Sequence, residues 1–435
     1  MIINDFLAKK DTSTNNINAA YREDEEKCIE NLIKNASFSD DVLIRIKTKA
    51  KILIEENIKQ LKKEGAISDF LNQYDLSTQE GIALMCLAEA LLRIPDKYTI
   101  NKLIGDKLST SDWQKHLSLK NSFFINATTW SLILTGKIFS SNVNTEKSLS
   151  QTLSKLIGRL GGSLIRPIVI KCMQLMGKQF VMGVTIEKAI ERAKKLEKIG
   201  YTYSYDMLGE GAKTADDAKK YFDSYLHAIK EIGKASIDLD HIKSPGISIK
   251  LSALHPRYEI AKRERVLKEL SPLLLELAKA AKKANIGLTV DAEESERLEL
   301  SLEVIKTVFE NPYLRGWEGL GLALQSYQKR ALFVIDWLAD LSKQNNKKLM
   351  IRLIKGAYWD SEIKNSQVQG LKEYPVFTRK HSTDVSFIAC MKKIISYKEC
   401  FYPQFGTHNA YSVAAAIETL GNRKDFEFQC LHGMG

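Results

Sequence analysis

Three segments in the second half of the chain decide the fold: GISIKLSAL (246–254), IGLTVDAEE (286–294) and LGLALQSY (320–327). Each is a short strand-like run, and an amphipathic stretch of helical length, RERVLKELSPLLLELAKAAKKAN (263–285), separates the first two. Strand-like runs that alternate with amphipathic helices are typical of β/α units around a parallel sheet. These segments therefore predict an α/β fold.

Four further segments have the same character, so the sequence predicts seven strands in all. They are GYTYSYDML (200–208), KLMIRLIKG (348–356), FYPQFGTHN (401–409) and FEFQCLHGMG (426–435). The stretch from residue 201 to residue 435 is close in length to the roughly 250 residues of an eight-stranded β/α (TIM-like) barrel. We predict such a barrel over residues 196–435. Because seven strands are visible, we expect it to lack its last strand and helix.

An open doubly wound sheet is the alternative architecture. Such a sheet usually carries a glycine-rich turn after its first strand, GxGxxG or GxxxxGKS/T. The segment LGEG (208–211), which follows the first predicted strand, matches neither pattern. The barrel is therefore the favoured interpretation.

The first half of the chain predicts helices. A capping box at STQE (77–80) precedes apolar residues at helical spacing, among them Leu84, Leu87 and Leu91, and Pro95 follows where the helix should end. We predict a flexible N-terminus over residues 1–20, and a helical arm with an α-domain over residues 21–195. No cluster of candidate catalytic or ligand-binding residues is found in this half of the sequence.

The composition is that of a folded globular protein, with 44% hydrophobic and 27% charged residues. The formal charge of +11 is compatible with binding of nucleic acid, an anionic membrane surface or a phosphorylated cofactor. The simpler interpretation is that the lysine-rich surface only keeps the protein soluble. The 6 cysteines form no CxxC pair, which argues against a zinc site or a disulfide framework and favours a reducing compartment. Neither a secretory signal nor a stretch of membrane-spanning length is found. We expect a cytoplasmic protein, with peripheral membrane contact left open.

Polar side chains gather at the predicted carboxyl ends of six strands, the edge that carries the active site in β/α barrels. They are Lys250, Asp291, Glu293, Gln325, Arg352, Gln404, His408, Glu427 and Gln429. For any single residue of this kind a structural ion pair is the commoner explanation. A polar lining on six strands, however, costs burial free energy unless a ligand or a dense network satisfies it. The pattern predicts an enzyme or a ligand-binding barrel.

Two of the chemistries that these residues leave open are covalent catalysis and metal binding. Lys250 could form a Schiff base if desolvation lowered its pKa. A metal could be bound by the carboxylates and the one histidine near the strand ends, although such a set is weak evidence. That set is Asp291, Glu293, Glu294 and His408.

A third chemistry is the binding of a pyrophosphate that carries a planar heterocycle. Three cationic residues in and after the fifth predicted strand suit the charge: Lys355, Arg379 and Lys380. Gly356 permits close approach of the backbone, and Gln325 and Arg352 could hydrogen-bond the heterocycle. Without these neighbours, the pair Arg379–Lys380 would be interpreted as a solvated surface feature.

Long segments of the chain resemble the proline dehydrogenase region of the bacterial bifunctional proline utilisation A flavoenzymes. In the second half they are YSYDMLGE (203–210), GISIKLSALHPRY (246–258), DAEESERLE (291–299), YQKR (327–330), MIRLIKGAYWDSEIK (350–364), YPVFTRK (374–380), YPQFGTHNA (402–410) and FEFQCLHGMG (426–435). In the helical half they are STQEGIALMCLAEALLRIPDK (77–97) and SFFINATTWSLILTGK (122–137). The resemblance implies a distorted eight-stranded β/α barrel with non-covalent FAD, preceded by an arm and a helical domain. It also implies that L-proline is oxidised to pyrroline-5-carboxylate in proline catabolism, with electrons passed to a membrane quinone.

The resemblance further implies a role for each matching residue. Arg352, Lys250 and Asp291 are the expected catalytic residues, with Arg352 beside the flavin N5 and the other two as a charge pair, which displaces the Schiff-base interpretation. The expected proline pocket is Asp206, Lys250, Asp291, Tyr358 and Leu431. The expected cofactor-binding residues are Asp291, Gln325, Arg352, Lys355, Gly356, Ala357, Trp359, Thr378, Arg379, Lys380, Thr407, His408, Asn409, Gln429, Cys430 and Leu431. No metal is expected.

Four departures from the family pattern are visible. Family members carry a tyrosine and an arginine pair in the last strand and helix that clamp the proline carboxylate, and these would follow Gly435, so we expect poor proline binding by this chain. No aldehyde dehydrogenase region follows, and residues 1–20 do not resemble a ribbon-helix-helix domain, so no DNA-binding domain is recognised. GGSL (161–164) stands where the family usually has Gly-Glu-Pro-Leu.

The alternatives to a proline dehydrogenase are a catalytically dead FAD-binding or unclosed-barrel remnant, a Schiff-base lyase that uses Lys250, and a nucleic-acid binder that would account for the charge of +11. The last would show steeply salt-dependent binding. The oligomeric state stays open, with a homo-oligomer among the alternatives.

Overall fold

The structure, a computed structural model, describes residues 12–61, 168, 170–172, 177, 181–207, 209–236 and 239–433. The chain divides into two compact units, one made of Met1–Ile54 with Gly183–Gly435 and the other of Glu55–Met182. We describe the first unit by itself. The capping box at 77–80, the segment 122–137 and the GGSL motif at 161–164 lie outside the described residues.

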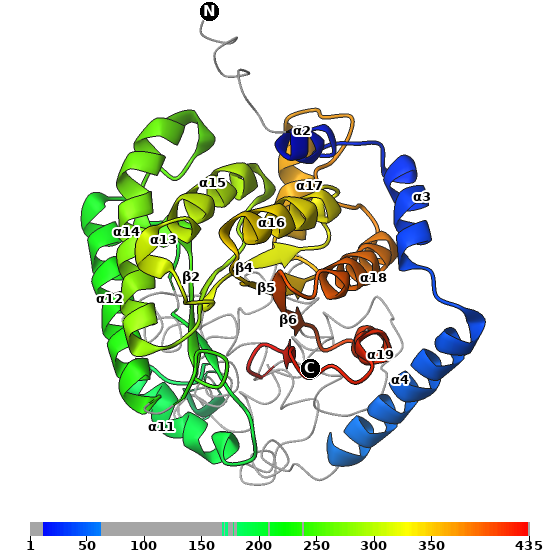
Figure 1. The fold of residues 1–435 in the computed structure, drawn as a ribbon, viewed down its shortest axis with the longest axis horizontal. Helices are drawn as coiled ribbons and strands as arrows, with labels where there is room; N and C mark the ends of the chain where they lie inside the picture. The colour runs from blue at the N-terminus through cyan, green and yellow to red at the C-terminus, as the bar shows by residue number, and fades with distance from the viewer. Residues whose placement is uncertain are drawn as a thin grey trace, which may run out of the picture. The chain divides into compact units, whose positions relative to one another are not determined.

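In the described ranges, seven parallel strands form one sheet in the order β1-β2-β3-β4-β5-β6-β7, with the helices α12 to α19 between them (Figure 1). The strands are β1 (Ser204–Asp206), β2 (Gly246–Ile249), β3 (Leu288–Val290), β4 (Leu320–Gln325), β5 (Leu349–Ile354), β6 (Phe401–Gly406) and β7 (Glu427–Gln429). Each lies within a predicted segment, so the α/β class and the β/α barrel type are confirmed. The predicted segments are longer than the strands because they continue into the exit loops.

The helices of the described ranges precede the strands or lie between them. They are α2 (Thr12–Ala19), α3 (Glu25–Ala36), α4 (Asp40–Leu61), α11 (Ile186–Glu197), α12 (Ala215–Ala235), α13 (Leu251–Leu254), α14 (Arg263–Ala284), α15 (Leu298–Phe309), α16 (Ala331–Asn345), α17 (Trp359–Val368), α18 (Lys380–Ser396) and α19 (Ala410–Leu420). In α14 the buried residues Val266, Leu270, Leu274 and Leu277 recur at helical spacing, and Asn285 ends the helix in the left-handed conformation. The predicted helix at 263–285 is therefore confirmed.

The register of the sheet brings polar side chains of three neighbouring strands into one row. Arg352 of β5 pairs with Gln404 of β6, and Gln404 pairs with Glu427 of β7. Residues that are paired across parallel strands point to the same face. The Gln404 Nε2 donates to Glu427 Oε1 at 2.8 Å, which fixes this row where β6 meets β7.

The N-terminal helices pack on the barrel helices, α2 on α16 and α3 on α18 (Figure 1). The segment 1–20, which the sequence predicts to be flexible, contains α2, and Ile17 of that helix is buried. The predicted boundary at residues 20 and 21 also separates residues that belong to one compact unit. This helix was not predicted from the sequence because α2 is short and mostly polar. Its apolar residue Ile17 is buried by contact with α16, which is distant in the sequence.

Replacing Leu274 by alanine should destabilise the chain by about 2–5 kcal/mol, because its side chain is fully buried between α14 and its neighbours. Glu276→Ala, on the exposed side of the same helix, is the matched control and should change stability little. Urea unfolding followed by circular dichroism measures both. Equal midpoints for the two variants would contradict the packing described for α14.

Candidate active site

The guanidinium of Arg352 joins side chains from five strands or strand ends. Its Nη1 donates to Asp291 Oδ1 at 2.8 Å and to Ser248 Oγ at 2.8 Å, and its Nη2 donates to Ser204 Oγ at 2.9 Å. Its Nε donates to Gln429 Oε1 at 2.5 Å. Residues of β1, β2, β3, β5 and β7 thus converge on one planar group. Asp291 and Gln429 were predicted for this site from the sequence, whereas Ser204 and Ser248 were not. Ser248 lies on the same face of its predicted strand as Lys250, which was the available signal.

Lys250 completes a set of charges around Arg352. It follows β2 as the N-cap of α13, and its Nζ lies 3.1 Å from both carboxylate oxygens of Asp206 and 3.4 Å from Asp291 Oδ2. Although burial alone would lower the pKa of Lys250, the charges of Asp291 and Asp206 raise it above the ordinary value. Lys250 therefore stays protonated, which removes the condition for a Schiff-base nucleophile. We call these groups, with Ser204, Ser248 and Gln429, the Arg352 network.

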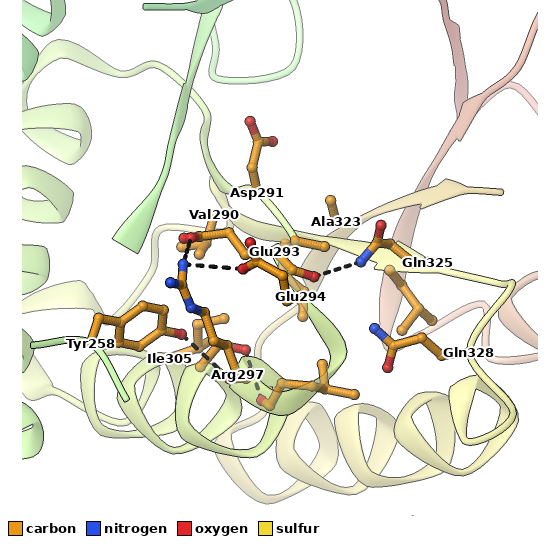
Figure 2. Close-up of a pocket in the computed structure, with 15 residues that line it drawn as sticks. Tyr258, Val290, Asp291, Glu293, Glu294, Arg297, Ile305, Ala323, Gln325 and Gln328 are labelled. Carbon is orange, nitrogen blue, oxygen red and sulfur yellow. Dashed lines mark hydrogen bonds and ion pairs between the residues drawn. The ribbon is translucent and has the colours of Figure 1, made fainter. Parts of the chain in front are cut away.

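The loop after β3 is held by a second layer of buried polar groups (Figure 2). The buried carboxylate of Glu293 accepts from the backbone N of Ser252 at 3.0 Å and from Arg297 Nη1 at 2.5 Å. Burial raises the pKa of Glu293. Because Ser252 lies in the first turn of α13, this bond ties the β3 exit to the helix that begins next to Lys250.

Gln325, at the end of β4, ties the β3 exit to the β5 exit. Its Nε2 donates to the Glu293 carbonyl at 2.9 Å (Figure 2). Its Oε1 accepts from the Ala357 backbone N at 2.9 Å. The cavity beside it has a volume of about 20 Å³, which is large enough for one water molecule and too small for a cofactor. In the structure Gln325 is therefore a buried residue whose hydrogen bonds connect the loop after β3 to the loop after β5.

Lys355 lies in the loop after β5, and the other two predicted phosphate-binding cations, Arg379 and Lys380, lie at the start of α18. Asp384 bridges Lys355 and Lys380, at 2.6 Å from each Nζ. Although burial raises the pKa of Asp384, the two ammonium groups lower it below the ordinary value. Asp384 was not among the predicted site residues, although its i,i+4 spacing from Lys380 indicates an ion pair on one face of a helix.

Gly356 and Trp359 shape the same loop. Gly356 has a φ of 145°, and a Cβ there would lie 2.4 Å from the ring of Tyr327, so close packing and backbone conformation both require glycine. The Trp359 Nε1 donates to the Phe377 carbonyl at 2.9 Å, which holds α17 near the start of α18. The half-buried Tyr358 lies in the chain between Gly356 and Trp359, and burial raises the pKa of its hydroxyl.

Thr378 and Arg379 lie at the start of α18. Both donors of Thr378 are taken by Glu25 of the N-terminal arm: the backbone N and the Oγ each lie 3.0 Å from Glu25 Oε2. Arg379 is exposed and is the N-cap residue of α18. No pattern in the sequence identified Glu25 as a neighbour of this segment, because more than 350 residues separate it from Thr378.

The exits of β6 and β7 hold the remaining predicted residues. Thr407 N donates to the Gln429 carbonyl at 3.0 Å, and Asn409 caps α19 by accepting from Ser412 N at 3.0 Å. The other three predicted residues here are exposed: His408, Cys430 and Leu431.

The structure thus brings Arg352, Lys250, Asp291, Asp206 and Gln429 together. It places Gln325 and Ala357 in the layer beneath them. A second group lies around the start of α18: Lys355, Gly356, Trp359, Thr378, Arg379 and Lys380. Among the residues in the described ranges, no group of three or more His, Cys, Asp or Glu side chains is arranged to hold a metal ion. The same ranges contain no helix that is long and apolar enough to cross a membrane.

A family model described as "Proline dehydrogenase" matches residues 189–435, which contain every strand of the described sheet. The chain belongs to the proline dehydrogenase family. A second model, described as "Proline utilization A proline dehydrogenase N-terminal domain", matches residues 15–56. The resemblance drawn from the motifs is therefore confirmed.

Longer bifunctional proteins are among the similar ones. The chain is 49% identical over 425 residues to the bifunctional protein PutA of Escherichia coli (strain K12), and the matched region covers 96% of this chain and 32% of that protein. It is 26% identical to proline dehydrogenase 1 of Bacillus subtilis subsp. natto, over 60% of this chain and 76% of that protein. A solved structure of a proline utilization A variant from Bradyrhizobium japonicum has a TM-score of 0.70 and 45% identity, and covers 95% of this chain and 41% of that chain. The chain thus spans about a third of the length of the PutA of Escherichia coli.

The prediction that no DNA-binding domain is recognised is wrong. A family model described as "DNA-binding domain of Proline dehydrogenase" matches residues 66–180. The prediction depended on the absence of a ribbon-helix-helix motif in residues 1–20, whereas the matched segment lies in the helical half. Of that segment, the structure describes residues 168, 170–172 and 177.

The pKa of Lys250 can be tested by chemical labelling. Replacing Asp291 by asparagine removes a negative charge next to the Lys250 ammonium group. The pKa of Lys250 should therefore fall, and a larger fraction of Lys250 should be deprotonated at a given pH. Acetylation of Lys250 at pH 9, followed by peptide mass spectrometry and measured relative to the exposed Lys262, should then be several-fold faster than in the parent chain. An unchanged ratio would contradict the raised pKa.

Proposed function

We propose that the chain oxidises L-proline to pyrroline-5-carboxylate in proline catabolism, with FAD as the cofactor and a membrane quinone as the electron acceptor. One observation carries the proposal: in a chain of the proline dehydrogenase family, two cations, Arg352 and Lys250, are held at the strand exits by Asp206 and Asp291. The names of similar proteins support the substrate, since they include a proline dehydrogenase and a proline utilization A protein.

The donor set of the described residues fits an anionic flavin dinucleotide. At one end Arg352 and Lys250 provide fixed donors at the carboxyl edge of the sheet. At the other end, Lys355, Arg379 and Lys380 provide three positive charges, which suit a pyrophosphate. Bound FAD would supply the acceptor for the hydride of proline, at N5 of its ring, and pass the electrons onward.

Arg352 is the residue that we assign beside the flavin N5. A fixed cation there favours the negative charge that the ring gains on reduction. Because Asp291, Ser248, Ser204 and Gln429 already orient the guanidinium, little reorganisation is needed when that charge develops.

We assign the proline pocket to Asp206, Lys250, Asp291, Tyr358 and Leu431. The two carboxylates suit the amino group of proline, and Lys250, which stays protonated, keeps both in place. Burial raises the pKa of Tyr358, so its hydroxyl stays a hydrogen-bond donor at neutral pH. Leu431 is exposed and offers an apolar contact.

The other family-matched residues are assigned to the cofactor. Gln325 acts through the loops that it joins, since its amide already bonds Glu293 and Ala357. The rest of this set is Gly356, Ala357, Trp359, Thr378, Thr407, His408, Asn409, Gln429, Cys430 and Leu431.

We place the reaction in the cytoplasm, at the inner face of the bacterial inner membrane. A membrane quinone requires the reduced protein to reach the lipid surface. The net charge of +11 favours docking on anionic lipid.

The visible absorption of the purified chain tests the cofactor and the substrate together. We expect a flavin spectrum that bleaches when L-proline is added without oxygen. In Arg352→Met the rate of bleaching should fall about 100-fold, because a fixed donor at the developing charge is lost. Stopped-flow absorbance measures both rates.

The matched control is Arg315→Met, which removes an exposed arginine remote from the strand exits and should bleach like the parent chain. A parent spectrum with bound flavin that proline does not bleach would favour the catalytically dead alternative. Equal rates in the parent chain and Arg352→Met would remove Arg352 from the reacting centre.

A further inference from the structure

Glu362 is a buried carboxylate that no step of the proposed reaction uses. It lies in the first turn of α17 and is 6% exposed. Its Oε1 accepts from the backbone N of Ser295 at 2.6 Å, and its Oε2 accepts from the Ser295 Oγ at 2.7 Å. Ser295 begins the 3₁₀ turn Ser295–Arg297, which follows the β3 exit. Two hydrogen bonds to one residue therefore tie the start of α17 to the loop after β3.

Both groups that donate to this carboxylate are neutral. Burial raises the pKa of Glu362, although the two Ser295 donors act in the opposite direction. A buried carboxylate costs free energy unless hydrogen bonds replace the water that it has lost. An apolar side chain of similar size would fill the same place at a lower desolvation cost, but it could not fix Ser295. The arrangement therefore favours a role in holding two loops together over a role in stability alone.

Ser295 is held from two further sides. It is 1% exposed, and its carbonyl accepts from Nη2 of Arg330, in the β4 exit. The Arg330 side chain is 1% exposed, and its guanidinium carbon lies 4.3 Å from the centre of the Tyr21 ring. The Tyr21 hydroxyl lies 3.4 Å from the Ser295 Oγ. Glu362 is thus bonded to a residue that the β4 exit and the N-terminal arm already fix in place.

The other end of this connection is Tyr358, which we assign to the proline pocket. Tyr358 is the N-cap residue of α17, and its carbonyl accepts from the backbone N of Glu362 at 3.0 Å. Burial raises the pKa of the Tyr358 hydroxyl, and the positive charge of Lys250 opposes that rise. The hydroxyl therefore lies within electrostatic reach of Lys250. Because one turn of α-helix is a stiff connection, the position of the Glu362 carboxylate determines the position of Tyr358.

We infer that Glu362 is a positioning residue for the substrate: by bonding Ser295 it fixes Tyr358 at the pocket and so sets the affinity for proline. The inference rests on the proposed function, because it takes Tyr358 to line the proline pocket. Glu362 itself touches neither substrate nor cofactor. Its loss should therefore weaken substrate binding more than the transfer of the hydride.

Two variants of Glu362 separate hydrogen bonding from charge. Glu362→Ala removes both bonds to Ser295, whereas in Glu362→Gln the amide oxygen still accepts from Ser295 N and the amide nitrogen donates to Ser295 Oγ. Anaerobic stopped-flow bleaching of the flavin over a range of proline concentrations gives a half-saturating concentration and a limiting rate for each variant. We expect the half-saturating concentration to rise about 10-fold in Glu362→Ala and less than about 2-fold in Glu362→Gln. The limiting rate should stay within about 2-fold of the parent value in both.

Two further variants complete the set. Asp360→Ala is the matched control, because Asp360 is an exposed acidic residue in the same turn of α17, and it should leave both parameters unchanged. Ser295→Ala keeps the backbone bond to Glu362 and removes the hydroxyl bond, so the half-saturating concentration should rise about 3-fold. Ser295→Ala tests the same contact where Glu362→Ala does not fold.

A double-mutant cycle with Tyr358→Ala tests whether Glu362 acts through Tyr358. Adding Glu362→Ala to Tyr358→Ala should change the half-saturating concentration less than about 2-fold, because the side chain that Glu362 positions is already gone. Full additivity of the two substitutions would mean that Glu362 acts by another route, and it would overturn the inference.

Other results would also overturn it. An unchanged half-saturating concentration in Glu362→Ala and Ser295→Ala, with only a lower melting temperature, would show a purely structural role. An equal rise in Glu362→Gln and Glu362→Ala would show that the charge matters and the hydrogen bonds do not. A parent chain with bound flavin that proline bleaches at no concentration would contradict the proposed function itself, whereas in a parent that is bleached these failures concern Glu362 alone.

Discussion

The candidate site depends on one guanidinium. Arg352 accounts for the position of Asp291, Ser248, Ser204 and Gln429, which come from four other strands or strand exits. A planar group with five N–H donors in a fixed geometry can hold so many partners at once, and a lysine cannot. The requirement that these side chains meet one group therefore constrains how β1, β2, β3 and β7 are placed around β5.

Much of this arrangement follows from the sequence. The alternation of strand-like and helical segments predicted all seven described strands, and the polar residues at the strand ends predicted the edge at which Arg352, Lys250 and Asp291 meet. These signals are local in the chain, and a parallel sheet converts them into proximity because all its strands end at one edge. The motifs also led to the proline dehydrogenase family.

What the sequence did not predict comes from contacts between distant segments. Glu25 meets Thr378 because α3 packs on α18, and nothing local in either segment encodes that packing. The role of Gln325 toward the cofactor stays a prediction, and the sequence did not show that its two polar ends bond the backbone of two loops. The match of residues 66–180 to a DNA-binding domain model was not predicted for a different reason: the expected ribbon-helix-helix motif belongs to the N-terminus, and the matched segment lies in the helical half.

The central claim is that the converging strand ends around Arg352 form a flavin site. A crystal structure of the chain reconstituted with FAD tests it most directly. We expect the flavin ring within hydrogen-bonding distance of Arg352, with the dinucleotide running past Lys355 toward Arg379 and Lys380 at the start of α18. Flavin density elsewhere on the molecule, with Arg352 still bonded to Asp291, Ser248, Ser204 and Gln429 and to no cofactor atom, would contradict it.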